Sequence, residues 1–115
     1  MFKINNITSD YHQEFVFSFD FGDVYLRLYY SDLLLGWFFG ITYGDFVIDN
    51  RRLSNFPNLL NQYNNMIPFG LYCKTKNGLD VVSRYQFQDG SASLYFLNKQ
   101  EVNDALNYDL RRAYE

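Results

Sequence analysis

The chain has 115 residues, of which 48% are hydrophobic and 21% aromatic, and this length suits one domain with a single core. Its net charge of -3 removes the counterion-release term that supplies most affinity for nucleic acid, so stable DNA or RNA binding is not expected. The only cysteine cannot form an internal disulfide, no stretch reads as a secretory signal, and the longest apolar run falls far below the roughly 20 residues that span a bilayer. We therefore expect a chain made in the cytoplasm that does not cross a membrane.

Large aromatic residues are in excess, with 12 Phe and 11 Tyr. This is more than the core of a small monomer needs, and such side chains are costly to leave in water. We therefore expect a partner to cover part of the surface.

The strongest pattern runs from Phe15 to Tyr30 and alternates with period two. A two-residue turn at Gly22-Asp23 predicts a hairpin in which Phe21 lies opposite Val24, with the phenylalanines and leucines on one face. The apolar faces of this hairpin and of the later strands define an expected core of Phe15, Phe17, Phe19, Phe21, Leu26, Leu28, Trp37, Ile41, Leu94 and Phe96.

A second hairpin is expected where residues 36–43 resume the alternation. Gly44-Asp45 predicts the reversal, because glycine supplies the positive φ that the first position of a type II′ turn requires. Phe46 is then expected to face Tyr43. Residues 54–68 leave two alternatives open, a helical turn after Pro57 or an extended crossing, and we favour the crossing.

Two further hairpins are predicted by Asn77-Gly78 and Asp89-Gly90, since these dipeptides suit type I′ turns. Their strands would be residues 69–75, 80–87 and 92–97. The expected fold class is thus all-β, a small antiparallel barrel or sandwich built of hairpins, with one C-terminal helix.

That helix is indicated by a change of period after Asn98. Asn98 and Glu101 form an asparagine variant of the capping box, which predicts a helix from about Lys99 to Ala113. We divide the chain into a β domain, residues 1–97, and an assembly appendage, residues 98–115. The apolar stripe of this helix could dock on the chain's own β core or on a neighbouring subunit. We favour the neighbouring subunit, because a helix of about 15 residues is marginal in water, and we expect deletion of residues 99–115 to leave a folded domain that no longer assembles. The residues expected at a subunit interface are Arg27, Tyr29, Arg51, Arg52, Leu106, Tyr108, Leu110, Arg111 and Arg112.

Candidates for chemistry are few. The neighbours of His12 offer no carboxylate or cysteine at a metal-ligand spacing, and an ordinary exposed histidine is the favoured interpretation. Cys73 lies in a strand-like run, where a packed thiol is favoured over a nucleophile. The aspartates lie mostly in or beside turns, which explains them without catalysis. We expect no enzymatic activity, no catalytic residue, no metal and no cofactor.

Exposed aromatic residues could stack on sugars or on nucleic-acid bases, and the candidates are Tyr25, Tyr29, Tyr72 and Tyr95. A subunit interface or the second layer of a sandwich is the favoured interpretation, because no basic residues align with these tyrosines.

Several short motifs recur in a fixed order along the chain. They are Leu26-Arg27-Leu28 within an alternating run, Gly36-Trp37, Leu59-Leu60 with Tyr63, and Pro68-Phe69-Gly70-Leu71. Over about residues 12–97, this order resembles the small baseplate plug proteins of contractile-tailed phages, of the cyanophage type. The helix beyond Asn98 lies outside the resemblance.

The resemblance implies a non-enzymatic structural protein of the virion tail baseplate, made in the host cytoplasm. It implies a place on the tail axis between the tail tube and the central hub and spike. The implied partners are identical subunits in a six- or threefold ring, the tail tube and the baseplate hub, with the tape-measure protein as a further candidate. The alternatives are a carbohydrate- or receptor-binding β module of a tail, and a small enzyme of another kind.

Overall fold

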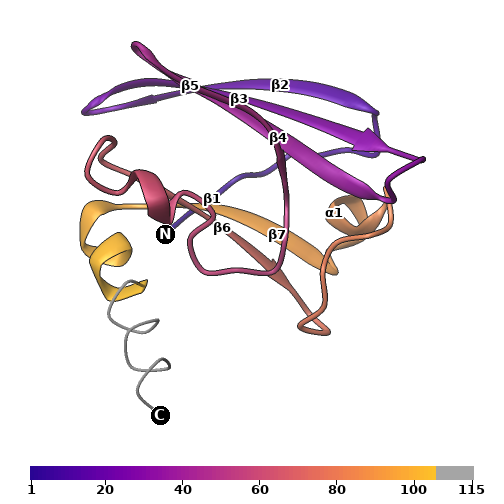
Figure 1. Cartoon of the computed structure of the whole chain (residues 1–115). Helices are drawn as coiled ribbons and strands as arrows, with labels where there is room; N and C mark the ends of the chain where they lie inside the picture. The colour runs from indigo at the N-terminus through magenta and orange to yellow at the C-terminus, as the bar shows by residue number, and fades with distance from the viewer. Residues whose placement is uncertain (106–115) are drawn as a thin grey trace.

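The computed structural model describes residues 1–105, and two antiparallel sheets form most of this part. A four-stranded sheet has the order β2-β3-β4-β5, and a three-stranded sheet has the order β1-β7-β6. Figure 1 shows them as two layers that face each other. The expected all-β fold is confirmed, and its form is an open sandwich. The elements are β1 (Phe2–Lys3), β2 (His12–Phe19), β3 (Gly22–Ser31), β4 (Gly36–Tyr43), β5 (Phe46–Arg52), η1 (Asn61–Tyr63), β6 (Gly70–Thr75), α1 (Gln86–Asp89) and β7 (Ala92–Leu97).

The β2–β3 hairpin keeps the expected faces but has a different register. Phe19 pairs with Gly22, so the turn is Asp20-Phe21 and the prediction of a Gly22-Asp23 turn is wrong. Each β2 residue pairs four positions earlier on β3 than expected, and an even shift leaves every side chain on its own face. Burial of the phenylalanine row therefore does not distinguish the two registers.

Phe21 is the expected core residue that this register displaces. It lies in the turn and is 38% exposed, so its assignment to the core is wrong. Its ring still covers one edge of the core, where it stacks on Phe19 and Phe69 at centroid distances of 5.0 Å and 5.7 Å.

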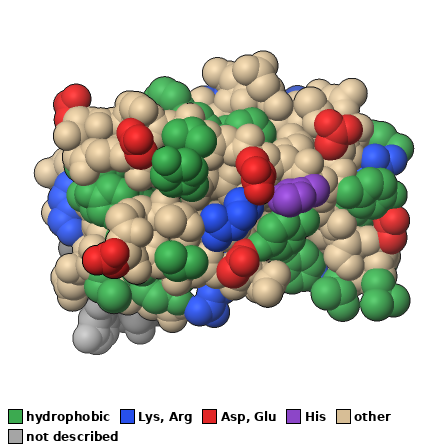
Figure 2. Space-filling view, turned by 90° about the horizontal axis from the view of Figure 1, so that it is seen from above, with side chains coloured by type: hydrophobic (Ala, Val, Ile, Leu, Met, Phe, Trp, Pro, Cys, Tyr) green, Lys and Arg blue, Asp and Glu red, His purple; other side chains and the backbone are tan. Residues whose placement is uncertain are grey.

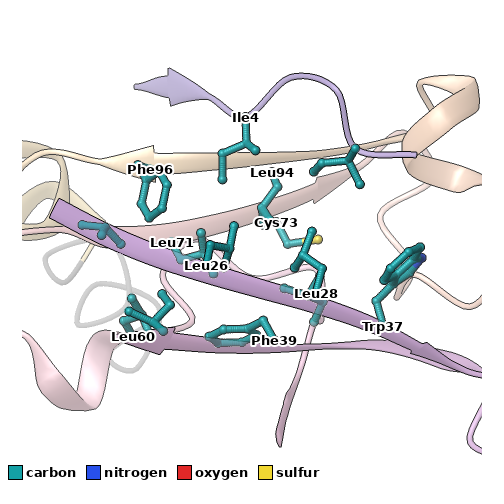
Figure 3. Packing of buried hydrophobic residues seen from close by; sticks show 14 of the residues in the cluster. Ile4, Leu26, Leu28, Trp37, Phe39, Leu60, Leu71, Cys73, Leu94 and Phe96 are labelled. Carbon is teal, nitrogen blue, oxygen red and sulfur yellow. The ribbon is translucent and has the colours of Figure 1, made fainter. Parts of the chain in front are cut away.

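The core fills the space between the two sheets (Figure 3). Leu26 from the larger sheet and Leu94 from the smaller one are both completely buried. Phe15, Phe17 and Phe19 are only partly buried, because β2 is an edge strand of its sheet. The other buried residues that the sequence assigns to the core are Leu28, Trp37, Ile41 and Phe96.

The β4–β5 hairpin has the predicted register. Tyr43 pairs with Phe46 across the turn, where Gly44 has a φ of 57°. Farther along, the register shifts between Phe39 and Ile41, which leaves one extra residue on β5. Asn50 lies in this bulge with a φ of 55°.

The second half of the chain contains one hairpin, not the two that were expected. β6 pairs directly with β7, from Gly70 opposite Leu97 to Thr75 opposite Ala92. Residues 80–87 form no strand, and the connection contains α1 instead. Asp89-Gly90 ends this helix, and Gly90 has a φ of 86°. The predicted hairpin turn at these two residues is wrong, because a helix end and a hairpin turn both favour glycine at positive φ.

Residues 54–68 combine both of the alternatives considered for them. Phe56 forms an isolated bridge with Cys73, as an extended crossing would, and η1 then forms one helical turn. Asn58 is 2% exposed, and its side-chain oxygen accepts hydrogen bonds from the backbone N–H groups of Leu60 and Leu71 at 3.0 Å and 3.2 Å.

The C-terminal helix begins at residue 99, as predicted. The backbone N–H of Glu101 donates to the Asn98 side chain at 2.9 Å, and the backbone N–H of Asn98 donates to the Glu101 carboxylate at 3.0 Å. Val102 is 1% exposed, so the start of the helix packs on the chain's own sandwich. The expected helix end near Ala113 lies outside the described residues. No helix within residues 1–105 has the length and apolarity needed to cross a membrane.

Candidate interaction surfaces

The outer face of the four-stranded sheet carries a polar network around Arg27 (Figure 2 shows this face). The Arg27 guanidinium donates to Thr42 Oγ1 at 2.9 Å and to the Ile48 carbonyl at 3.3 Å. The Tyr29 hydroxyl donates to the Asp49 carboxylate, which lies 4.0 Å from Arg27 Nε. The network shows that Arg27 and Tyr29, both expected at an interface, already have partners inside the chain.

Arg51 and Arg52 also have internal partners. Arg51 donates to the Tyr63 hydroxyl at 2.7 Å. Arg52 donates to the carbonyls of Leu34 and Leu35 at 3.1 Å and 2.8 Å. The interface role of these arginines stays a prediction, and each of them holds a neighbouring segment in place. The other expected interface residues, Leu106, Tyr108, Leu110, Arg111 and Arg112, lie outside the described part of the chain.

The turn between β3 and β4 exposes three consecutive leucines, Leu33–Leu35, which we call the leucine tip. Their exposed fractions are 91%, 57% and 59%. Leu35 has a φ of 49°, a conformation that a bulky non-glycine residue rarely adopts. These exposed leucines do not pack in the core. An exposed apolar turn with a strained backbone indicates a surface that contacts another protein.

An aromatic cluster lies directly behind the leucine tip. The Tyr11 hydroxyl donates to the Asp32 carboxylate at 2.9 Å, and this hydrogen bond raises the pKa of Tyr11. The Arg84 guanidinium lies between the rings of Tyr11 and Tyr85, 4.4 Å and 4.7 Å from their centroids. Tyrosine and arginine, with tryptophan, are enriched among the residues that carry most of the binding energy at protein interfaces.

The opposite end of the sandwich has an apolar groove, which we call the phenylalanine groove. Its volume is about 350 Å³. Phe21 and Phe2 are partly exposed in it, 38% and 48%, and Met1 is 68% exposed. The groove is lined by Met1, Phe2, Phe19, Phe21, Phe69, Phe96, Leu97, Asn98 and Glu101.

Sequence reasoning missed both the leucine tip and the phenylalanine groove. The tip had a signal, because Leu33–Leu35 follows Ser31 and Asp32, two residues that break the strand pattern. The groove had none, since its residues come from the chain start, the β2–β3 turn and the β6–β7 pair.

The candidates for chemistry are dispersed. His12 is exposed, 3.6 Å from Glu14, and its ring meets Tyr29 edge-on. Burial, with a smaller contribution from Asp80, raises the pKa of the Cys73 thiol to about 12, so the thiolate nucleophile is scarce at neutral pH. Among residues 1–105, no group of three or more histidine, cysteine or acidic side chains could hold a metal ion.

Of the tyrosines considered as a sugar platform, Tyr25 and Tyr29 lie on the larger sheet, and Tyr72 and Tyr95 pair across the smaller one. Tyr72 and Tyr95 are half-buried, and their rings stack on each other with centroids 5.8 Å apart. Their stacking leaves less of each ring face available to a ligand.

These features define the class of the protein as a small β-sandwich that exposes apolar surfaces at its two ends. A family model described as cyanophage baseplate Pam3 plug gp18 matches residues 1–99. The match spans the whole sandwich, and the chain therefore belongs to this family of phage baseplate plugs. The resemblance found in the sequence is confirmed, and the match also includes β1. No curated protein matches the chain.

Membership in this family makes the protein a structural component of a phage baseplate, and hence of the virion tail. As a baseplate protein, it interacts with other components of the baseplate.

Proposed function

We propose that the protein is a plug subunit that forms a ring of identical copies on the tail axis. The ring lies between the tail tube and the central hub and spike, and it touches both. The observation that carries this proposal is the family match over residues 1–99.

The distribution of apolar surface supports a role in assembly. The leucine tip and the phenylalanine groove lie at different ends of the sandwich, as a subunit with a neighbour on each side requires. The arginines of the outer face are held in fixed positions by internal hydrogen bonds, so they would present a preorganised polar surface to a second partner.

A carbohydrate- or receptor-binding role would need aromatic rings that expose their faces side by side. The mutual stacking of Tyr72 and Tyr95 favours assembly over that alternative. An enzymatic role has less support still, because Cys73 is buried and its pKa is raised.

The test is a particle reconstruction of the virion tail with the sandwich fitted into the baseplate density. We expect the protein on the axis, in several symmetry-related copies, in contact with tube and hub. Density for the protein at the baseplate periphery or at the tip of a fibre would contradict the proposal and support receptor binding. Co-purification with the tube and hub proteins after co-expression gives a second measurement, and a control with a sheath protein checks its specificity.

A further inference from the structure

The leucine tip has a fixed shape before it meets any partner. Arg52 donates to the carbonyls of Leu34 and Leu35, and the Ser31 hydroxyl accepts a hydrogen bond from the Leu34 N–H at 3.1 Å. Gly36 makes room for this arrangement, because a Cβ there would lie 2.5 Å from the Arg52 guanidinium. A rigid apolar knob loses little conformational entropy when it inserts into a partner.

The phenylalanine groove is an acceptor of matching chemistry. Phenylalanines form most of its walls, and its volume of about 350 Å³ has room for aliphatic side chains. Phe2 meets Phe17 and Phe19 edge-on at 5.7 Å and 5.5 Å, so the ring arrangement is also set within the chain.

The leucine tip and the phenylalanine groove lie at opposite ends of the sandwich. β3 begins at Gly22 beside the groove and ends at Ser31 beside the tip, so its ten residues separate them by about 30 Å. Figure 1 shows the chain start and the far end of β3 towards opposite ends of the sandwich. Neither surface can reach the other within one molecule.

The charges around the two surfaces are complementary. Arg52 and Arg84 lie at the tip, where Asp32 is engaged by the Tyr11 hydroxyl. Asp20 and Asp23 are exposed and flank Phe21, whose side chain lines the groove, and Asp23 lines a second hollow that Phe21 also borders. The groove itself holds the N-terminal ammonium and Glu101, which pair at 2.8 Å and add no net charge. A tip that enters the groove therefore brings guanidinium groups towards exposed carboxylates.

We propose that Leu33–Leu35 of one subunit insert into the phenylalanine groove of the next copy of this chain. The contact is head-to-tail, so each copy contributes one leucine tip and one phenylalanine groove. Repeating the contact closes a ring when the rotation from one copy to the next is a whole-number fraction of a full turn. This inference rests on the proposed ring and names the contact that builds it.

The first test compares Leu33→Asp with Leu79→Asp by analytical ultracentrifugation of the full chain. Leu33 and Leu79 are 91% and 66% exposed, so both variants are expected to fold, but Leu79 lies between β6 and α1, outside the tip. We expect the wild-type protein and Leu79→Asp to form the same oligomer over a wide range of concentration. We expect Leu33→Asp to lose the oligomer and sediment as a monomer.

The second test mixes two variants that are each defective on one side. Phe2→Asp damages the groove and keeps the tip, whereas Leu33→Asp damages the tip and keeps the groove. Alone, each variant is expected to stay a monomer. Together they are expected to give a one-to-one complex that does not grow, because only one intact contact is present. Phe21→Asp replaces Phe2→Asp if circular dichroism shows that the latter does not fold.

Several outcomes overturn the inference. They are a wild-type chain that stays a monomer, a Leu33→Asp variant that assembles normally, or equal loss of assembly in Leu79→Asp. Loss of hub or tube binding by Leu33→Asp with an unchanged oligomer also overturns it, because the tip would then dock on another baseplate protein. A particle reconstruction separates the two proposals: an axial ring with another contact refutes only this inference, and absence from the axis refutes the function.

Discussion

At the scale of single residues, Gly36 and Gly70 owe their identity to a side chain that occupies their space. A Cβ at Gly70 would lie 2.7 Å from the buried Asn58 amide oxygen, and one at Gly36 would meet the Arg52 guanidinium. Asn58 and Arg52 both bind backbone groups of nearby loops. Each glycine therefore allows a polar side chain to lie flat on the backbone and fix a loop.

Gly70→Ala is expected to destabilise the fold by about 1–3 kcal/mol, because it displaces Asn58 from the N–H groups of Leu60 and Leu71. Urea unfolding of a double-mutant cycle measures this. In an Asn58→Ala background the added methyl group meets no amide, so the cost of Gly70→Ala is expected to fall to a few tenths of a kcal/mol. Equal costs in both backgrounds would show that the two residues do not interact.

Cys73 is expected to resist alkylation in the folded protein. It is completely buried, and its raised pKa keeps the thiol protonated. Labelling with a thiol reagent at mildly alkaline pH, with and without denaturant, measures this. Labelling is expected to follow unfolding, and a native rate equal to that of a free cysteine peptide would contradict the described burial.

At the scale of the elements, the hairpins differ in what fixes their register. In β4–β5, Gly44 with its positive φ sets the turn directly. In β2–β3, the turn falls two residues before the sequence Gly22-Asp23, and Phe21 moves to the surface. The strand faces follow from alternation, but the register follows from the pairing along the whole hairpin.

This register predicts unequal costs for truncating Phe19 and Phe21 to alanine. Phe19 packs against the core and meets Phe96 edge-on at 5.5 Å, so its loss is expected to cost about 2–3 kcal/mol, below the 3–5 kcal/mol typical of full burial. Phe21 lies in the turn, so Phe21→Ala is expected to cost about 1 kcal/mol. Denaturant titration of both variants checks the order, and a larger cost for Phe21 would favour the Gly22-Asp23 turn.

The capping box at the C-terminal helix predicts a pH effect on stability. Burial raises the pKa of Glu101, but the Asn98 N–H and the N-terminal ammonium, 2.8 Å away, outweigh it and leave the pKa lowered. Because the pKa of Glu101 is lower in the folded protein than in the unfolded chain, its charge stabilises the fold at pH values above the unfolded pKa of about 4.3. This stabilisation is lost as the pH falls through the pKa of the folded protein. Glu101→Gln keeps the hydrogen bond to Asn98 without the charge.

The difference in melting temperature between the wild-type protein and Glu101→Gln is therefore expected to be largest near neutral pH and to shrink below about pH 4. Asn98→Ala is the matched variant for the cap itself, with an expected cost of about 1 kcal/mol. A difference that is constant with pH would mean that the charge of Glu101 does not contribute.

At the scale of the whole molecule, the sandwich has ends of different character. One end carries the leucine tip, and the other carries the phenylalanine groove and the start of the C-terminal helix. The aromatic excess of the sequence is divided between the core and these surfaces. The start of the helix belongs to the sandwich, because Val102 is buried there.

The burial of Val102 refines the expected effect of removing the C-terminal segment. Deletion of residues 99–115 is expected to cost about 2–4 kcal/mol, since it removes a buried valine and the capping box. Deletion of residues 106–115 is expected to leave the melting temperature unchanged and to weaken self-association, as an assembly appendage would. Differential scanning calorimetry and ultracentrifugation separate these effects. Unchanged association after the shorter deletion would contradict the appendage.

The sequence alone determined the features that depend on neighbours along the chain. Alternation assigned the faces of β2, β3 and β4, Gly44-Asp45 placed one turn, and Asn98 with Glu101 placed the start of the helix. These are local matters of side-chain direction, backbone φ and capping. The order of short motifs also led to the baseplate plug family, which the match over residues 1–99 confirmed.

Tertiary structure decided the features that depend on partners distant in the chain. The even register shift of β2–β3 leaves the face pattern unchanged, so no alternation can detect it. Asp89-Gly90 carries the same signal for a helix end as for a hairpin turn, and β6 pairs with β7 across a connection that local patterns assigned to a strand. The phenylalanine groove and the degree of exposure of the leucine tip became visible only once the strands were arranged in space, because exposure is a property of the packed molecule and not of a residue type.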